Sequence, residues 1–452
     1  MADQVLDTNR TSGADTVIPD ATLLGVDLSP SPSSDVVKVA ATPPIVPQPL
    51  YLLELFAGAG GLAQGFERAG RFEAAALYDI SKPARDAYTN FKPSAVYRAL
   101  NVRHLKRRSV YNDLDGRPLH GILGGPPCQG FSLAGKRNLQ AETNELVRSY
   151  ARKVDALEPF FLVLENVPQL LFHELFRPLL KKLSEKYLMT YGVLNAARYG
   201  TPQTRHRLIL IAYHRSLGIQ PTLPQPTHGL LNQQLYAYHL IDSTQRVELT
   251  AETSKVLFGA DPVIHDYINV KSANLDLRPN LSLLPLVTVG DAISDLSATE
   301  DSKPLAYVSE ANSAYQRFLR TDQSEVHNCL TRKHVGRPLE VALTLREGGT
   351  PSREPGALFK RYYSQAYARL HRDGLARTLT TYFMNAGSGR FIHYEQPRTL
   401  TVREAARLQG FTDAFVFAGN LQEQMQVVGN AVPLPLAEAI GRHVRGEIGD
   451  LL

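Results

Sequence analysis

One cysteine stands in a sequence context suited to nucleophilic chemistry. Cys128 lies within residues 124–130, Gly-Gly-Pro-Pro-Cys-Gln-Gly, directly after a short apolar run. The prolines fix φ and stiffen the loop before the thiol, while the glycines let it bend. A thiolate is an intrinsically strong nucleophile, and a neighbouring positive charge lowers its pKa. A buried structural cysteine is the alternative, but these flanking residues pack poorly in a core.

An acid and two arginines could complete such a site. Glu165 ends the apolar run 160–164, and partial burial there is expected to raise its pKa and make it a proton donor near neutral pH. Arg205 and Arg207 precede the run 208–212, and at the entrance of that strand we expect them to point to opposite faces. One can then pair with a site carboxylate while the other reaches a phosphate or base oxygen. The alternatives are a helix cap for the acid and ordinary surface arginines.

A glycine-rich turn indicates a second kind of chemistry. Residues 54–62, Glu-Leu-Phe-Ala-Gly-Ala-Gly-Gly-Leu, join an apolar run to a helical stretch. Glycines let a ligand approach the backbone, and the start of a helix presents free N–H groups. Asp79 ends the next strand, where a carboxylate can accept hydrogen bonds from ribose hydroxyls. The turn is not Gly-x-Gly-x-x-Gly, so a nicotinamide cofactor is poorly supported, and a tight turn without a ligand is the alternative.

Alternating apolar runs and helical stretches must position these residues. The predicted strands are residues 50–56, 74–78, 121–123, 160–164 and 208–212, and predicted helices include 62–69 and 144–156. Near-continuous apolar strands suit a parallel sheet that is buried on both faces. We therefore expect an α/β fold with a doubly wound, mostly parallel sheet, whose strand ends carry the ligands.

The remaining segments predict a division into four parts. Residues 1–48 are acidic and lack aromatic residues, which indicates a disordered tail. Residues 49–212 form the predicted catalytic domain, and the proline-interrupted residues 213–397, which mix basic and aromatic side chains, form a smaller irregular domain. Residues 398–452 return to the first domain through a capping box, Thr401 to Glu404, which opens a helix ending at Leu408. Residues 428–433 are interpreted as a structured turn that leads into a final helix over 435–444. The alternative is an ordinary start of a helix, which the sequence does not exclude.

Charge and cysteine content narrow the class of protein. The formal net charge is +5, and the tail contributes −4, so the rest carries about +9, which suits a polyanionic partner. Two cysteines, Cys128 and Cys329, cannot make a disulfide framework, and their spacing predicts no metal site. A reducing, cytoplasmic compartment is expected. No apolar run is long enough to predict a membrane span.

Taken in order, these motifs resemble the DNA (cytosine-5) methyltransferase family over residues 50–212 and 398–445. The matching segments are 56–61 (Phe-Ala-Gly-Ala-Gly-Gly), 126–132 (Pro-Pro-Cys-Gln-Gly-Phe-Ser), 165–167 (Glu-Asn-Val), 203–207 (Gln-x-Arg-x-Arg), 403–411 (Arg-Glu-Ala-Ala-Arg-Leu-Gln-Gly-Phe) and 429–433 (Gly-Asn-Ala-Val-Pro). Any one of these could arise by chance, whereas five or more in family order are highly specific.

The resemblance implies S-adenosylmethionine as cofactor and methyl transfer to C5 of a flipped-out cytosine in duplex DNA. Cys128 would add to C6, Glu165 would hold N3, Arg207 would support the base oxygen, Arg205 would support the site and Asn166 would fix the loop. The implied cofactor contacts are Phe56, Gly58, Gly60, Gly61, Leu62, Asp79, Ile80, Asn101, Val102, Pro127, Asn430 and Val432, with Asp79 at the ribose and Asn430 near the methionine part. The implied DNA contacts are Gln129, Gly130 and Ser132, and residues 213–397 would act as target-recognition domain.

Two positions depart from the family pattern, and two rival functions share parts of it. The family commonly has Glu at Asp79 and Asp at Asn101, although the amide oxygen of Asn101 can still accept a hydrogen bond from an adenine amino group. An RNA-modifying branch is one rival, but its Cys-Phe-Thr signature is missing. A catalytically dead DNA-binding regulator is the other, and the intact Cys128 and Glu165 argue against it. We further expect a monomer, localised to the nucleoid through DNA, with a cognate restriction endonuclease as partner.

Overall fold

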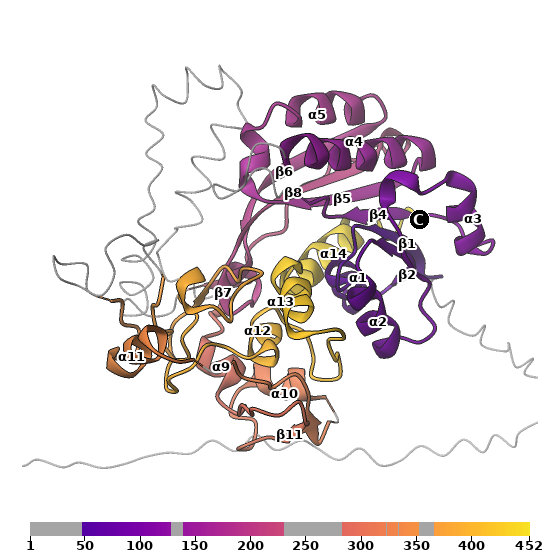
Figure 1. Cartoon of the computed structure of the whole chain (residues 1–452). Helices are drawn as coiled ribbons and strands as arrows, with labels where there is room; N and C mark the ends of the chain where they lie inside the picture. Colours follow the sequence, from indigo (N-terminus) through magenta and orange to yellow (C-terminus); the bar gives the residue numbers. More distant parts are fainter. Residues whose placement is uncertain (1–47, 128–138, 230–282, 322, 333, 352–365) are drawn as a thin grey trace, which may run out of the picture. The chain divides into compact units, whose positions relative to one another are not determined.

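The computed structural model describes residues 48–127, 139–229, 283–321, 323–332, 334–351 and 366–452 (Figure 1). Residues from Pro47 onward form one compact unit. Several predictions fall outside the described residues: the tail over 1–47, Cys128, and the DNA contacts Gln129, Gly130 and Ser132. Within the described part of the chain, no helix is both long and apolar enough to span a bilayer.

A seven-stranded sheet forms the centre of the fold, in the order β3-β2-β1-β4-β5-β8-β6. All neighbours pair in parallel except β8, which runs antiparallel to β5 and β6. The predicted mostly parallel α/β fold is thus confirmed. The strands are β1 (Leu50–Leu55), β2 (Phe72–Asp79), β3 (Tyr97–Ala99), β4 (Gly121–Gly124), β5 (Phe161–Asn166), β6 (Tyr187–Asn195) and β8 (His206–His214).

Alternate side chains of the strands are buried in two hydrophobic cores, one on each face of the sheet. In β1, Leu53 and Leu55 belong to the core that also contains residues of α3 (Arg107–Leu114), α4 (Leu139–Leu157) and α5 (Phe176–Ser184). Leu50 and Leu52 belong to the opposite core, with residues of α1 (Gly61–Arg68) and α14 (Leu434–Ile448). This two-faced burial explains why the strands are almost continuously apolar in sequence.

The five predicted strands and the two predicted helices are present with their ends displaced by a few residues. Two strands of the seven-stranded sheet, β3 and β6, were not predicted. β3 has only three residues, and β6 is the edge strand, with a mixed pattern in which most side chains are half-buried. Neither pattern carries the apolar run that marks the central strands.

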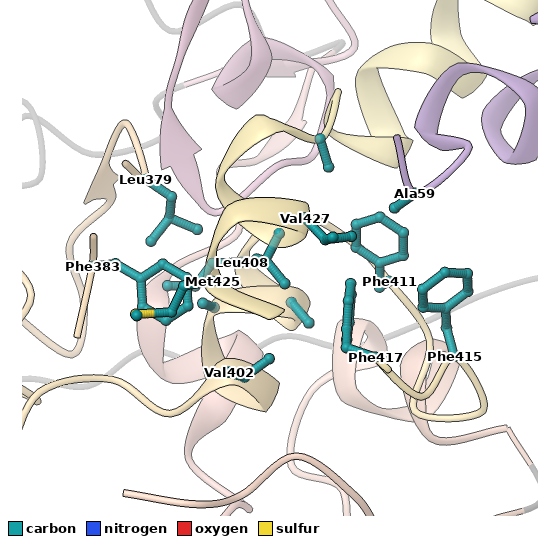
Figure 2. Packing of buried hydrophobic residues seen from close by; sticks show 14 of the residues in the cluster. Ala59, Leu379, Phe383, Val402, Leu408, Phe411, Phe415, Phe417, Met425 and Val427 are labelled. Atoms are coloured by element: carbon teal, nitrogen blue, oxygen red, sulfur yellow. The ribbon is translucent and has the colours of Figure 1, made fainter. Parts of the chain in front are cut away.

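The C-terminal helices share a third core with the irregular part of the chain. α12 (Val402–Leu408) begins at the predicted capping box and ends at the predicted residue. It packs with α13 (Leu421–Asn430) and with buried residues of α9 (Val289–Ile293). Figure 2 shows the rings of Phe411, Phe415 and Phe417 in this core, near Ala59 of the glycine-rich turn. A continuous hydrophobic core therefore extends across the domain boundary that the sequence predicted at residue 398.

Short elements complete the described structure. The remaining helices are α2 (Lys82–Phe91), α10 (Ala314–Arg320), α11 (Arg337–Thr344), and the 3₁₀ turns η1 (Val102–His104), η2 (Pro168–Phe172), η3 (Ala196–Tyr199), η4 (Arg215–Leu217) and η5 (Ala386–Ser388). Two-residue strands pair as β7 (Gln203–Thr204) with β13 (Ala376–Arg377), β9 (His228–Gly229) with β10 (Leu284–Pro285), and β11 (Leu305–Ala306) with β12 (Glu325–Val326). The β7–β13 pair joins the region just before β8 to the irregular region.

A buried ionic cluster lies inside this third core. Arg407 donates two hydrogen bonds to the carboxylate of Asp413 and one to Asp295, and all three side chains are completely buried. The guanidinium of Arg403 lies 3.5 Å from Asp413 and donates to the carbonyls of Thr412 and Phe415. Each buried charge therefore has a partner of opposite sign, which is the condition under which charges are tolerated in a core.

Candidate active site

Glu165 and Arg207 form an ion pair at the carboxyl end of β5. Arg207 Nε lies 2.8 Å from Glu165 Oε1, and each side chain is only 11% exposed. The antiparallel pairing of β5 with β8 brings these two strand ends together, since Glu165 lies opposite Ile209. The expectation that one arginine pairs with a site carboxylate is confirmed, and the pair supplies a positive charge and an acid at one point.

The loop that leads to Cys128 begins against this acid. A Cβ added at Gly125 would lie 3.0 Å from Oε2 of Glu165, so a larger residue there would require the carboxylate to move by a few tenths of an ångström. The side-chain amide of Asn166 donates to the carbonyl of Pro126 at 3.0 Å. The last described residues of the loop are therefore tied to β5 at two consecutive positions, Glu165 and Asn166.

Arg205 takes a different direction from the one predicted. Its side chain is 2% exposed and donates to the carbonyls of Leu379 and Gly429, 3.1 and 3.0 Å away. The expectation that this second arginine reaches a phosphate or base oxygen is wrong in this structure, because its guanidinium is buried and donates to backbone carbonyls. Arg205 instead joins β8 to the irregular region and to α13.

Gln203 supports the same junction and was missed as a functional position. Its side-chain amide donates to the carbonyl of Leu408 and to Oε1 of Gln409, and its own oxygen accepts from the N–H of Leu379. The side chain is completely buried. Its place two residues before Arg205 in the Gln-x-Arg-x-Arg motif was the available signal, because residues two apart share one face of an extended segment, and both side chains are buried.

The glycine-rich turn is shaped by close contacts from both sides. Phe56, Gly58 and Gly60 all have positive φ, between 51° and 70°. A Cβ at Gly60 would lie 2.3 Å from the ring of Tyr88, and one at Gly61 would lie 2.5 Å from the carbonyl oxygen of Val432. A Cβ at Gly58 would meet nothing within 4 Å. The turn therefore presents open backbone at Gly58 while Gly60 and Gly61 pack tightly.

The carboxylate of Asp79 stabilises this turn by accepting hydrogen bonds from backbone N–H groups. One carboxylate oxygen accepts from the N–H of Gly58 at 2.9 Å and the other from the N–H of Ser81 at 2.8 Å. The hydroxyl of Tyr97 donates to the carbonyl of Gly58. Burial raises the pKa of Asp79 above its ordinary value, against the effect of these hydrogen bonds. The N–H of Ile80 is a third donor to this carboxylate, and because its two oxygens have four lone pairs, one is left for a ribose hydroxyl.

Glu54 is a buried acid to which the sequence analysis gave no role. Its carboxylate accepts from the N–H groups of Ala63 and Leu62, at the start of α1. Burial raises the pKa of Glu54 to about 8, ahead of every other effect. The expectation that the start of this helix presents free N–H groups is therefore wrong for these two residues. An acid inside an otherwise apolar strand was the available signal.

The other predicted cofactor residues divide by exposure. Ile80 is 71% exposed, and Asn430 and Pro127 are also exposed. The side chains of Leu62 and Val102 are buried in the two sheet cores, so either could meet a cofactor only through backbone atoms. The amide oxygen of Asn101 accepts from the N–H of Arg103 and caps η1.

A family model for the C-5 cytosine-specific DNA methylases matches residues 50–445. The chain belongs to this family. Family members take the methyl group from S-adenosylmethionine, which is therefore the cofactor of this chain. The open backbone at Gly58, the adjoining carboxylate of Asp79 and the exposed Ile80 fit a nucleoside cofactor at the carboxyl edge of the sheet.

Similar proteins support this membership. The chain is 31% identical to the type II methyltransferase M.XorII of Xanthomonas oryzae pv. oryzae, over 87% of this chain and 84% of that one. It is 26% identical to the DNA (cytosine-5)-methyltransferase PliMCI of Paracentrotus lividus, but spans only 28% of its length. The fold resembles that of a prophage-encoded E. coli chain assigned to the DNA modification methyltransferases, with a TM-score of 0.64, 22% identity and coverage of 88% and 99% of the two chains.

Proposed function

We propose that this methylase transfers a methyl group to C5 of a flipped-out cytosine within a specific duplex DNA sequence, through a covalent adduct of Cys128. The ion pair of Glu165 with Arg207, held against Gly125 at the start of the Cys128 loop, is the observation that carries the proposal. Gly125, which lies three residues before Cys128, has this acid and this cation beside it. Thiolate addition to cytosine needs an acid at N3 and a cation at the neighbouring base oxygen, and these two atoms lie along one edge of the base.

The proposed roles follow from the chemistry of cytosine. C5 is a poor nucleophile until the Cys128 thiolate adds to C6 and makes C5 enamine-like. Glu165 holds N3 and helps to protonate it, while Arg207 supports the neighbouring base oxygen. Asn166 fixes the loop through the Pro126 carbonyl. S-adenosylmethionine, held by the glycine turn and Asp79, supplies the electrophilic methyl group. A base then removes the C5 proton, and Cys128 leaves.

Access to the target atom requires that the base leave the stack. In duplex DNA, stacking shields C5 and C6, and extrusion costs a few kcal/mol. Gln129, Gly130 and Ser132, next to Cys128 in the sequence, are the proposed contacts to the DNA around the flipped base. Residues 213–397 are the proposed target-recognition domain, and 49–212 with 398–452 the proposed catalytic domain. The relatives named as type II methyltransferases suggest a cognate restriction endonuclease, and we propose a monomeric enzyme associated with the nucleoid.

Labelled methyl transfer to duplex DNA tests this function. Cys128→Ala should abolish transfer and leave DNA binding intact, and the wild-type protein should form a covalent adduct with 5-fluorocytosine DNA. Transfer at the wild-type rate by Cys128→Ala would refute the mechanism. Transfer to tRNA but not to duplex DNA would refute the proposed substrate. Bisulfite sequencing of DNA from cells that express the protein would then give the recognition sequence.

A further inference from the structure

A run of exposed cations follows β3, outside the proposed active site. Arg103 and His104 lie on η1, and Lys106, Arg107 and Arg108 lie at the start of α3. All five side chains are exposed. No acidic residue occurs between Asp86 and Asp113, so the run, which we call the η1–α3 patch, carries uncompensated positive charge along the sequence.

The fold holds this patch rigidly. Val102, Leu105 and Val110, which alternate with the cations, are buried in the same core as the sheet. The ammonium of Lys153 on α4 donates to the carbonyl of Leu105. The cations therefore project from a fixed stretch of backbone, which lowers the entropy lost when they bind a ligand.

The patch has little compensation in space. Among the described residues, none of Arg103, Lys106, Arg107 and Arg108 forms an ion pair. The nearby acid Glu145 has its pKa lowered first by a hydrogen bond from Arg152, and also by the charges of Arg148 and Arg103. One carboxylate thus faces several arginines from α4 and η1, and the whole surface attracts anions.

The patch also lies on the ligand-binding edge of the sheet. Leu100 donates its N–H to the carbonyl of Asp79, and Ala99 pairs with Asp79 across β2 and β3. The cations begin two residues after Asn101, at the carboxyl end of β3. They are therefore on the same edge as the glycine turn, but they are not part of the proposed cofactor or base site.

We propose that the η1–α3 patch binds the phosphate backbone of duplex DNA outside the recognition sequence. This inference rests on the proposed function only in that it takes duplex DNA as the substrate. Rigid, unpaired Lys and Arg side chains neutralise phosphates without reading base sequence, and each such contact releases condensed counterions. The acidic residues 1–48, which carry six aspartates, are the other anionic candidate, but their charge is spread thinly along the sequence.

Binding to mixed-sequence duplex DNA, measured by fluorescence anisotropy over a salt series, tests the proposal. The patch variant is Lys106→Gln/Arg107→Gln/Arg108→Gln in the full chain. The control variant, Lys181→Gln/Lys182→Gln/Lys186→Gln, removes the same charge near the end of α5, where Lys182 and Lys186 already pair with acids. We expect the salt slope of log K to fall by about two to three in the patch variant, roughly 0.9 for each lost contact. The control should keep the wild-type slope.

The other outcomes separate the rival explanations. Equal losses in both variants would overturn the proposal, because net charge alone would then account for binding. Unchanged or tighter DNA binding by the patch variant would also overturn it, because the patch would then contribute no phosphate contact. Labelled methyl transfer is measured in parallel over a range of DNA concentrations, and the patch variant should keep the wild-type kcat with a raised KM for DNA. If the salt slopes differ as expected but neither the wild type nor either variant methylates DNA, the proposal for the patch is kept and the proposed function is refuted.

Discussion

The side chain of Glu165 faces both a cation and the backbone of the Cys128 loop, and this position makes a strong prediction about turnover. Glu165→Gln keeps the shape but removes the charge that pairs with Arg207 and the group that exchanges a proton with N3. We expect kcat to fall by about 10² to 10⁴, the usual contribution of a positioned acid. Single-turnover methyl transfer measures this loss. DNA binding is the control, and turnover within a few-fold of wild type would contradict the role.

Glu54 predicts a pH dependence of stability. The pKa of this acid is about 8 in the folded protein and near 4.5 as an unperturbed group. The folded state thus binds the proton more tightly, so the free energy of unfolding falls as pH rises from about 4.5 to 8. Glu54→Gln imitates the protonated acid and should lose this dependence.

Thermal unfolding at several pH values checks this expectation. The Tm of Glu54→Gln should exceed that of wild type by a margin that grows by about 5 °C between pH 5 and pH 8.5. The exposed acid Glu73 on the neighbouring strand provides the control, as Glu73→Gln. A constant Tm difference across this pH range would show that Glu54 does not titrate within it.

At the residue scale, the sequence predicted the identity of the site better than its contacts. The pairing of one arginine with a carboxylate followed from two arginines placed just before an apolar strand. Residues two apart on a strand share one face, and these two side chains diverge where β8 begins, because Arg205 lies before its first residue, His206. The burial of Arg205 against the carbonyls of Leu379 and Gly429 could not be predicted, because those partners are remote in sequence. The capture of the α1 N–H groups by Glu54 was also missed, since Glu54 was read only as part of a strand.

Among the elements, the glycine turn and the last helix depend on each other. The backbone of Val432, just before α14, lies where a Cβ of Gly61 would be. Gly61→Ala must therefore move the Val432 carbonyl or the turn itself. We expect the Kd for S-adenosylmethionine to rise by about tenfold or more, since a methyl group forced into backbone costs about 1–3 kcal/mol.

Isothermal titration with S-adenosylmethionine measures this effect. Gly446→Ala is a matched control, because it adds the same methyl group to α14 where nothing lies within 4 Å. It should bind the cofactor as wild type does, with slightly higher stability from the better helix propensity of alanine. Equal Kd values for both variants would show that the turn tolerates displacement.

At the element scale, the sequence predicted those helices and strands whose stability comes from residues within the element itself. The capping box at Thr401 is local, and the start and end of α12 were predicted to the residue. The strand β6 is half-exposed along most of its length, and its stability comes from pairing with β8 rather than from its own apolar pattern. The sequence of such a strand therefore has no clear pattern by which it could be predicted.

The buried ionic cluster predicts the largest effect on the stability of the molecule. Asp413 accepts hydrogen bonds from Arg407 and from the hydroxyl of Tyr307, within the core shared by α9 and α12. Asp413→Ala leaves Arg407 with only Asp295 and Arg403 without an acid. We expect the free energy of unfolding to fall by about 3–5 kcal/mol.

Urea unfolding measures that change. The exposed pair of Glu438 and Arg442 on α14 provides the control, and Glu438→Ala should cost no more than about 1 kcal/mol. A similar small loss for Asp413→Ala would mean that the cluster contributes specificity of packing rather than stability.

For the whole molecule, the sequence predicted the sheet and the return of the chain to it, whereas the cores that join distant segments could not be predicted. The third core draws on α2, α9, α12 and α13 together, and no local periodicity records such an arrangement. The division near residue 398 was drawn from the prolines before it and from the capping box and family motifs after it, and none of these local features shows that a core continues across the division.

The contact between Gly61 and Val432 also bears on how the protein is made. The ribosome releases the glycine turn well before Val432, the residue packed against Gly61, which lies 371 positions further along the chain. A nascent chain can form the early strands before it has a complete cofactor site. Products of interrupted translation should therefore lack methyl transfer, so no partly made chain modifies DNA.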